Sequence, residues 1–131
     1  MVLLGFDPGR DKCGLALVES DGEIILREVV SSQRAILTIK KWCQTYTVEK
    51  IIMGDKTTSK QWRDDLQKEL PNFSIVMVDE SNSTLEARER YWELSPPQGL
   101  MRFLPKGMRV PPCPVDDIVA VILVERFQLF L

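Results

Sequence analysis

Three acidic residues, far apart in the sequence, have the type and setting to carry chemistry: Asp7, Glu80 and Asp116. Asp7 ends an apolar opening run and is followed by Pro-Gly, a pair that favours a turn. Glu80 follows a second apolar run, and Asp116 opens a third, longer one. A carboxylate at the end of a buried strand is costly to desolvate unless it is paired, hydrogen-bonded or bound to a metal ion. These positions are therefore the candidate catalytic residues.

The sequence contains no histidine, which excludes Ser-His and Cys-His nucleophile pairs, imidazole bases and most transition-metal sites. Three carboxylates that meet repel one another, and a divalent cation compensates that repulsion. Ligand sets made only of oxygen favour hard cations. We therefore expect a Mg²⁺ or Mn²⁺ site with the ligands Asp7, Glu80, Asp116 and Asp117. Two such cations about 4 Å apart activate a water and stabilise the leaving oxygen in phosphodiester hydrolysis.

Each acidic residue also has a purely structural interpretation. Asp7 can cap an Asp-Pro-Gly turn, and Glu80 can cap a helix that follows it. Asp116 and Asp117 can complement the positive end of the last helix. A coincidence of all three is less expected than any one alone, and both interpretations stay open at the level of the sequence.

Composition bounds the class of protein. The chain has 131 residues, of which 44% are hydrophobic and 27% charged, with a net charge of −2, and these values are typical of one globular domain. The longest apolar stretch, residues 118–124, is too short to cross a bilayer, and no export signal opens the sequence. Three cysteines without CxxC spacing are typical of reduced thiols. We expect a single cytoplasmic domain over residues 1–131, without membrane association.

Positive charge gathers in one segment although the whole chain is slightly acidic. Residues 88–109 contain four arginines and one lysine against two glutamates. Such a rim beside an acidic site can bind a phosphate backbone, and a solvated surface loop is the alternative. The residues expected to contact substrate are Lys12, Lys56, Thr57, Arg102, Lys106 and Arg109.

The pattern of apolar residues predicts the elements that position these side chains. Strands are expected at residues 2–7, 12–19, 24–30, 50–55 and 74–78, and helices at 35–46, 59–70, 83–92 and 115–131. Ser31 or Ser32 is expected to cap the first helix, and Ser83 with Glu86 to form a capping box on the third. Residues 94–114, rich in proline, are expected to form an irregular loop. The order predicts an α/β fold with a mixed five-stranded sheet, three antiparallel strands then parallel strands, and helices on both faces.

Three segments carry a resemblance to a known family. They read GFDPG at residues 5–9 with GLA at 14–16, DESNSTLEA at 79–87, and VDDIVA at 115–120. In these motifs and in its order of elements, the chain resembles the YqgF/RuvX family, in the RuvC-like branch of the ribonuclease H fold. The resemblance implies a ribonuclease H-like sheet, with Asp7, Glu80 and Asp116 as the catalytic acids.

The resemblance also implies a function. Members of the family are associated with maturation of the 5′ end of 16S ribosomal RNA precursors, and also with Holliday-junction resolution. We therefore expect a metal-dependent nuclease, with structured RNA the favoured partner and branched DNA second; a homodimer is left open. The family usually has arginine where this chain has Ser81, so a catalytically silent nucleic-acid-binding module is a further alternative. In sugar-kinase-like ATPases, too, a phosphate-binding loop with an Asp-x-Gly motif follows the opening strand. These ATPases need two such domains to enclose a nucleotide, and 131 residues are too few for both.

Overall fold

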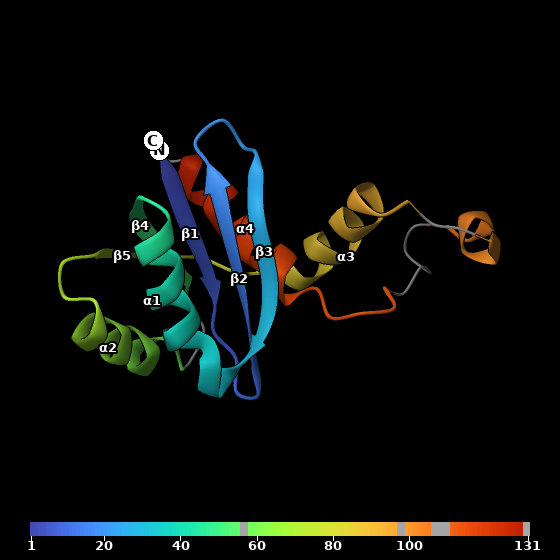
Figure 1. Cartoon of the computed structure of the whole chain (residues 1–131). Helices are drawn as coiled ribbons and strands as arrows, with labels where there is room; N and C mark the ends of the chain where they lie inside the picture. The colour runs from blue at the N-terminus through green and yellow to red at the C-terminus, as the bar shows by residue number, and fades with distance from the viewer. Residues whose placement is uncertain (56–57, 97–98, 106–110, 130–131) are drawn as a thin grey trace.

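The computed structural model describes residues 1–55, 58–96, 99–105 and 111–129. Five strands form one sheet in the order β3-β2-β1-β4-β5 (Figure 1). β1, β2 and β3 are antiparallel neighbours, whereas β1, β4 and β5 are parallel. This topology confirms the predicted mixed sheet. The strands are β1 (Val2–Asp7), β2 (Lys12–Glu19), β3 (Ile24–Ser31), β4 (Val48–Gly54) and β5 (Ser74–Val78).

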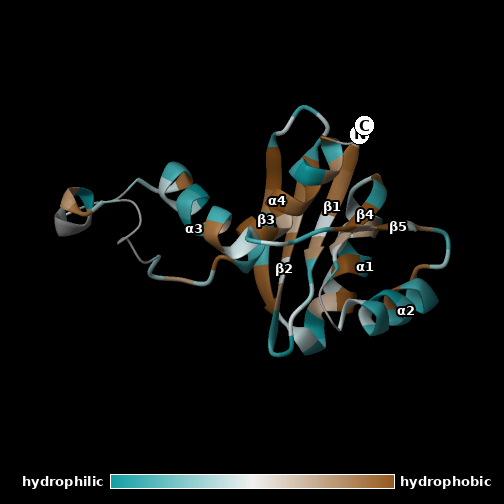
Figure 2. Ribbon diagram, turned by 180° about the vertical axis from the view of Figure 1, so that it is seen from behind, coloured by the Kyte–Doolittle hydropathy of each residue, from teal (hydrophilic) through white to brown (hydrophobic). Residues whose placement is uncertain are grey.

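Helices cover both faces of the sheet, as predicted (Figure 1). α1 (Ala35–Thr45) and α2 (Ser59–Glu69) pack on one face, and α4 (Asp116–Gln128) packs on the other. α3 (Ser83–Leu94) lies against α4. The strands and α4 are predominantly hydrophobic, whereas α2 and α3 show mostly hydrophilic residues (Figure 2). The sheet therefore separates two apolar layers, one beneath α1 and α2 and the other beneath α4.

The alternation of β1 explains where Asp7 points. Leu4 and Phe6 pack into the layer beneath α1 and α2, whereas Leu3 packs into the layer beneath α4. Successive side chains of a strand point to opposite faces, so Asp7 shares the α4 face with Leu3 and Gly5. A Cβ atom at Gly5 would overlap with the backbone carbonyl of Ala120. Glycine at this position is what allows α4 to lie so close to β1.

Several local expectations differ from the structure. η1 (Ser32–Arg34), a short 3-10 helix, precedes α1, and no side-chain hydrogen bond caps either helix, so the predicted serine cap is wrong. The predicted capping box on α3 is also wrong, because α3 begins after Asn82 without a side-chain cap, and Glu86 pairs with Arg126 instead. The proline-rich loop contains a second 3-10 helix, η2 (Gly99–Phe103). At α3, a long-range contact to α4 thus takes the place of the local capping box that the sequence favoured.

In the part of the chain that the structure describes, no helix has both the length and the hydrophobicity needed to cross a membrane.

Candidate active site at one end of the sheet

Asp7 lies between two glycines on the neighbouring strands. It pairs with Gly14 of β2, and on its other side Gly54 of β4 follows Met53, which pairs with Phe6. Gly14 and Gly54 share the α4 face with Asp7, since their alternate neighbours Ala16 and Ile52 pack into the layer beneath α4. Asp7 is 2% exposed. The buried carboxylate of Asp7 therefore has, on either side of it in the sheet, a position without a side chain.

Glu80 occupies the space above Gly54. A Cβ atom at Gly54 would overlap with the carboxylate of Glu80, so this side chain extends from the end of β5 back across β4. Both carboxylate oxygens of Glu80 are buried. Neighbouring strands are about 4.8 Å apart, and Glu80 thus lies about one strand spacing from the strand position of Asp7.

The start of α4 occupies the space above Gly14, on the other side of Asp7. A Cβ atom at Gly14 would overlap with the backbone of Asp116, so the first turn of α4 rests directly on β2. The Oδ2 atom of Asp116 lies 3.7 Å from Nζ of Lys12. The three predicted catalytic residues therefore follow one another along the same end and face of the sheet, in the order Glu80, Asp7, Asp116.

Asp117 has a different environment from Asp116. Its Oδ2 atom accepts a hydrogen bond of 2.8 Å from Nη1 of Arg27, on β3, and its Oδ1 atom accepts one of 3.0 Å from the backbone N–H of Ile118. The residue is 8% exposed. The structure thus places Asp117 in an ion pair between β3 and α4, and its role as a metal ligand stays a prediction.

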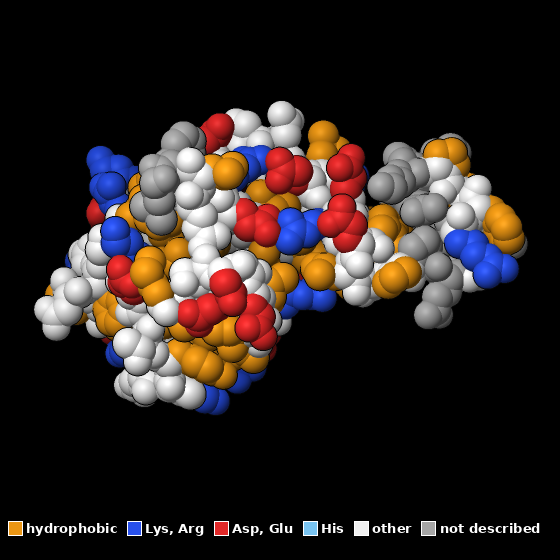
Figure 3. Space-filling view, turned by 90° about the horizontal axis from the view of Figure 1, so that it is seen from above, with side chains coloured by type: hydrophobic (Ala, Val, Ile, Leu, Met, Phe, Trp, Pro, Cys, Tyr) orange, Lys and Arg blue, Asp and Glu red, His pale blue; other side chains and the backbone are white. Residues whose placement is uncertain are grey.

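The predicted substrate-binding residues fall into three groups. Lys12 lies at the site, beside Asp116. Arg102 is exposed on η2, with its guanidinium 4.9 Å from the ring centroid of Phe103, and η2 projects from the rest of the molecule (Figures 1 and 3). The remaining residues lie outside those that the structure describes: Lys56, Thr57, Lys106 and Arg109.

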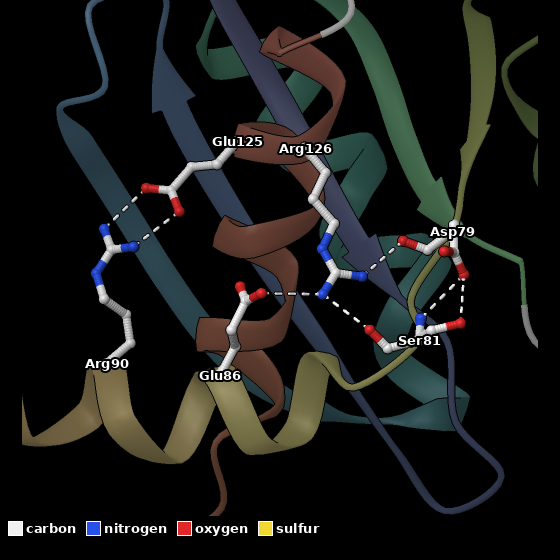
Figure 4. A network of polar contacts seen from close by, with 6 residues as sticks. All are labelled: Asp79, Ser81, Glu86, Arg90, Glu125 and Arg126. Carbon is white, nitrogen blue, oxygen red and sulfur yellow. Dashed lines mark hydrogen bonds and ion pairs between the residues drawn. The ribbon is translucent and has the colours of Figure 1, made fainter.

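The turn that carries Glu80 is held by residues that sequence reasoning missed. Arg126 of α4 donates hydrogen bonds from Nη1 to the carbonyl oxygen of Asp79, at 2.8 Å, and from Nη2 to that of Ser81, at 2.9 Å (Figure 4). The backbone N–H of Glu80 donates to Oδ1 of Asp55, at 3.3 Å. Arg126 therefore binds the backbone carbonyls of the residues on both sides of Glu80. A basic residue in the last turn of a helix ordinarily complements the helix dipole, so the sequence carried no signal for this contact.

Ser81 and Asp79 stabilise the same turn from within. Oδ1 of Asp79 accepts hydrogen bonds from the hydroxyl of Ser81, at 2.7 Å, and from its backbone N–H, at 3.0 Å. These two bonds, the hydroxyl one first, lower the pKa of Asp79. Ser81 thus has a local structural role at the position following Glu80.

The residues predicted as metal ligands offer carboxylate oxygens, whose chemistry fits a hard cation. Within the described residues, however, no group of three or more Cys, Asp and Glu side chains is gathered in a way that could hold a metal ion. Asp116 lies beside Lys12 and Asp117 beside Arg27, so each of these two carboxylates is paired with a cation of the chain.

Comparisons with known proteins agree with this fold. Residues 1–127 match the sequence profile of the RuvX family, described as Holliday junction resolvase. Among solved structures, T. thermophilus RuvC in complex with Holliday junction substrate is similar at a TM-score of 0.61 and 14% identity, covering 98% of this chain and 92% of that one. A second Thermus thermophilus RuvC structure gives the same values. A ROK family glucokinase from Streptomyces griseus has a TM-score of 0.48 at 14% identity, covering 70% of this chain and 37% of that one. No curated protein matches the chain.

The likeness to RuvC extends over nearly the whole length of both chains. At this level of identity it concerns the fold alone. It confirms the predicted ribonuclease H-like architecture, including the mixed sheet with helices on both faces.

Proposed function

Since the chain belongs to the RuvX family of Holliday junction resolvases, we propose that it is a nuclease that hydrolyses phosphodiester bonds. The observation that carries this proposal is the row of acidic residues along one end of the sheet. Asp7 lies between two glycines whose open positions are covered by Glu80 on one side and by the backbone of Asp116 on the other. A structural turn or helix cap would not require a carboxylate to be buried beside Asp7.

The proposed catalytic residues differ in accessibility, which suggests different roles. Asp7 and Glu80 are almost fully buried, at 2% and 7% exposure, and form the fixed part of the site. The side chain of Asp116 is 29% exposed, so it stands at the rim where substrate enters. These three residues, with Asp117 as a further candidate, would hold Mg²⁺ or Mn²⁺. Such an ion supplies positive charge against the reacting phosphate and lowers the pKa of a water.

We propose structured precursor ribosomal RNA, at the 5′ end of 16S ribosomal RNA, as the substrate in the cytoplasm. The family resemblance supports this choice. Branched DNA is the second candidate, and the description of the family as Holliday junction resolvases favours it. A homodimer is compatible with either substrate, and sedimentation of the purified protein measures the oligomeric state.

The test incubates the purified protein with labelled precursor RNA and with a four-way DNA junction, in Mg²⁺, Mn²⁺, Ca²⁺ or chelator. We expect cleavage in Mg²⁺ or Mn²⁺ and none in Ca²⁺, which is larger and holds its ligands less rigidly. Glu80→Gln should abolish cleavage. Glu49→Gln, an exposed glutamate at the start of β4, removes the same charge away from the site and should leave the rate unchanged.

The same assay decides against the proposal if the outcome is different. Tight binding without cleavage in any metal would assign the chain to the silent nucleic-acid-binding alternative. Cleavage that survives Glu80→Gln would place the active site elsewhere.

A further inference from the structure

A groove of about 230 Å³ opens at one end of the row of acidic residues, and Asp116 is among the residues that line it. Lys12 at the start of β2 and the α3 residues Thr84 and Arg88 line it together with the prolines that precede α4. The groove therefore places two cations and a hydroxyl beside a proposed catalytic residue.

The positive groups of this groove differ from the other cations nearby in how they are paired. Within the described residues, Arg88 is exposed and forms no ion pair, whereas Arg90, two residues later, makes two hydrogen bonds of 2.8 Å to Glu125. Lys12 is half exposed, and its only carboxylate neighbour among those residues, Asp116, lies at 3.7 Å. Both cations can thus accept an incoming anion without breaking a close ion pair.

The donors of the groove suit a phosphodiester. Lysine, arginine and threonine side chains are those that bind backbone phosphates, and such contacts position a strand without reading its sequence. Arg88 can present two parallel N–H donors to phosphate oxygens, and Lys12 a point charge. A neutral ligand would leave the charge of Arg88 unused.

We propose that Lys12, Thr84 and Arg88 bind one backbone phosphate of a nucleic-acid strand, next to the phosphate that is cleaved. This inference deepens the proposed function and rests on it for the identity of the strand. Because the groove ends at Asp116, the bound phosphate would fix the strand across the row of acidic residues. The site would serve RNA and DNA alike.

Binding without cleavage tests this subsite. The anisotropy of a labelled hairpin RNA and of a labelled four-way DNA junction is measured in chelator, over a range of KCl concentrations, for the wild type and Arg88→Gln. One lost phosphate contact reduces the log–log salt slope by about one, and we expect this loss equally on both nucleic acids. The double variant Lys12→Gln/Arg88→Gln should lose no more than about one unit of slope in total, because both side chains contact the same phosphate, whereas Arg88→Lys should keep a slope close to the wild-type value.

A matched control removes the same charge from the other face of the sheet. Arg63 lies on α2, and Arg63→Gln should leave the salt slope at its wild-type value. Inorganic phosphate is added as a competitor, and weak competition is expected because the strand supplies further contacts. Equal losses in Arg88→Gln and Arg63→Gln, no loss in either, or no binding of the wild type to any nucleic acid would each overturn the subsite.

Cleavage assays on the same variants keep the two proposals apart. If the wild-type protein cleaves and Arg88→Gln has an unchanged salt slope, the phosphate-binding groove is rejected while the proposed nuclease activity is retained. A slope that depends on Arg88, in a protein that cleaves neither substrate in any metal, supports the groove and rejects the nuclease.

Discussion

The carboxylate of Glu80 lies directly over Gly54, so that the absence of a side chain on β4 makes room for a charged group from the end of β5. Gly54 is itself the neighbour of Asp7 across the parallel pair β1 and β4. This relationship explains how a residue beyond the last strand can reach the middle of the sheet. It also makes the position of Glu80 sensitive to a single methyl group.

We first predict that Gly54→Ala reduces cleavage at least about tenfold, which corresponds to about 1.4 kcal/mol, with little change in melting temperature. The new Cβ would meet the far end of the Glu80 side chain, which can rotate away. Gly5→Ala is the matched comparison, because its Cβ would meet the backbone of α4 at Ala120, and overpacking of this kind costs about 1–3 kcal/mol. Thermal unfolding and cleavage rates separate the two effects. A Gly54→Ala protein with full activity would show that the position of Glu80 does not matter.

The second prediction concerns Arg126, which holds the turn but does not line the site. Arg126→Lys loses the forked pair of hydrogen bonds to the carbonyls of Asp79 and Ser81. Each net hydrogen bond is worth about 1 kcal/mol, so we expect a stability loss of about 1–2 kcal/mol and a fall in kcat of about tenfold at constant KM. Arg90→Gln breaks the ion pair with Glu125 without touching the turn and should retain kcat. A rise in KM alone would indicate that Arg126 contacts substrate.

The third prediction concerns charge at the centre of the row. The buried carboxylate of Glu80 lies over Gly54, the residue of β4 next to buried Asp7, and neighbouring like charges disfavour the ionised form of both groups. Asp7→Asn should therefore leave the free energy of unfolding unchanged or raise it, while it abolishes cleavage. Urea unfolding in chelator measures the first effect and the cleavage assay the second. A large loss of stability would instead give Asp7 a structural role.

The fourth prediction is a pH dependence of the turn. The Ser81 hydroxyl, followed by the Ser81 backbone N–H, lowers the pKa of Asp79 in the folded protein. A depressed folded pKa contributes stability above the unfolded value of about 3.9, and this contribution is lost as pH falls through the folded pKa. Ser81→Ala removes the larger of the two causes.

The stability difference between wild type and Ser81→Ala should therefore be full at neutral pH and should shrink below about pH 4. Urea unfolding at neutral and acidic pH measures it. A difference that stays constant with pH would mean that the hydroxyl acts through a group other than the ionised Asp79.

Much of the architecture could be predicted from the sequence because it depends on local patterns. The apolar run that opens the sequence, ended by Asp7 and Pro-Gly, predicted a strand over residues 2–7, and β1 (Val2–Asp7) is that strand. The apolar character of residues 118–124 predicted a buried final helix, and α4 is that helix. Strand pattern and helix period follow from sterics and burial over a few residues, so they are legible in a single chain.

What the tertiary structure alone decided is which side chains meet across the fold. Arg126 contacts residues 45 and 47 positions away, and Arg27 pairs with Asp117 over 90 positions. Neither contact can be predicted from the local sequence, because each depends on how closely α4 lies on β1 and β2. The absence of side chains at Gly5 and Gly14 permits that close approach. The same packing placed Arg88 across a groove from Lys12, since the direction of a surface side chain follows from the docking of its helix rather than from the residues beside it.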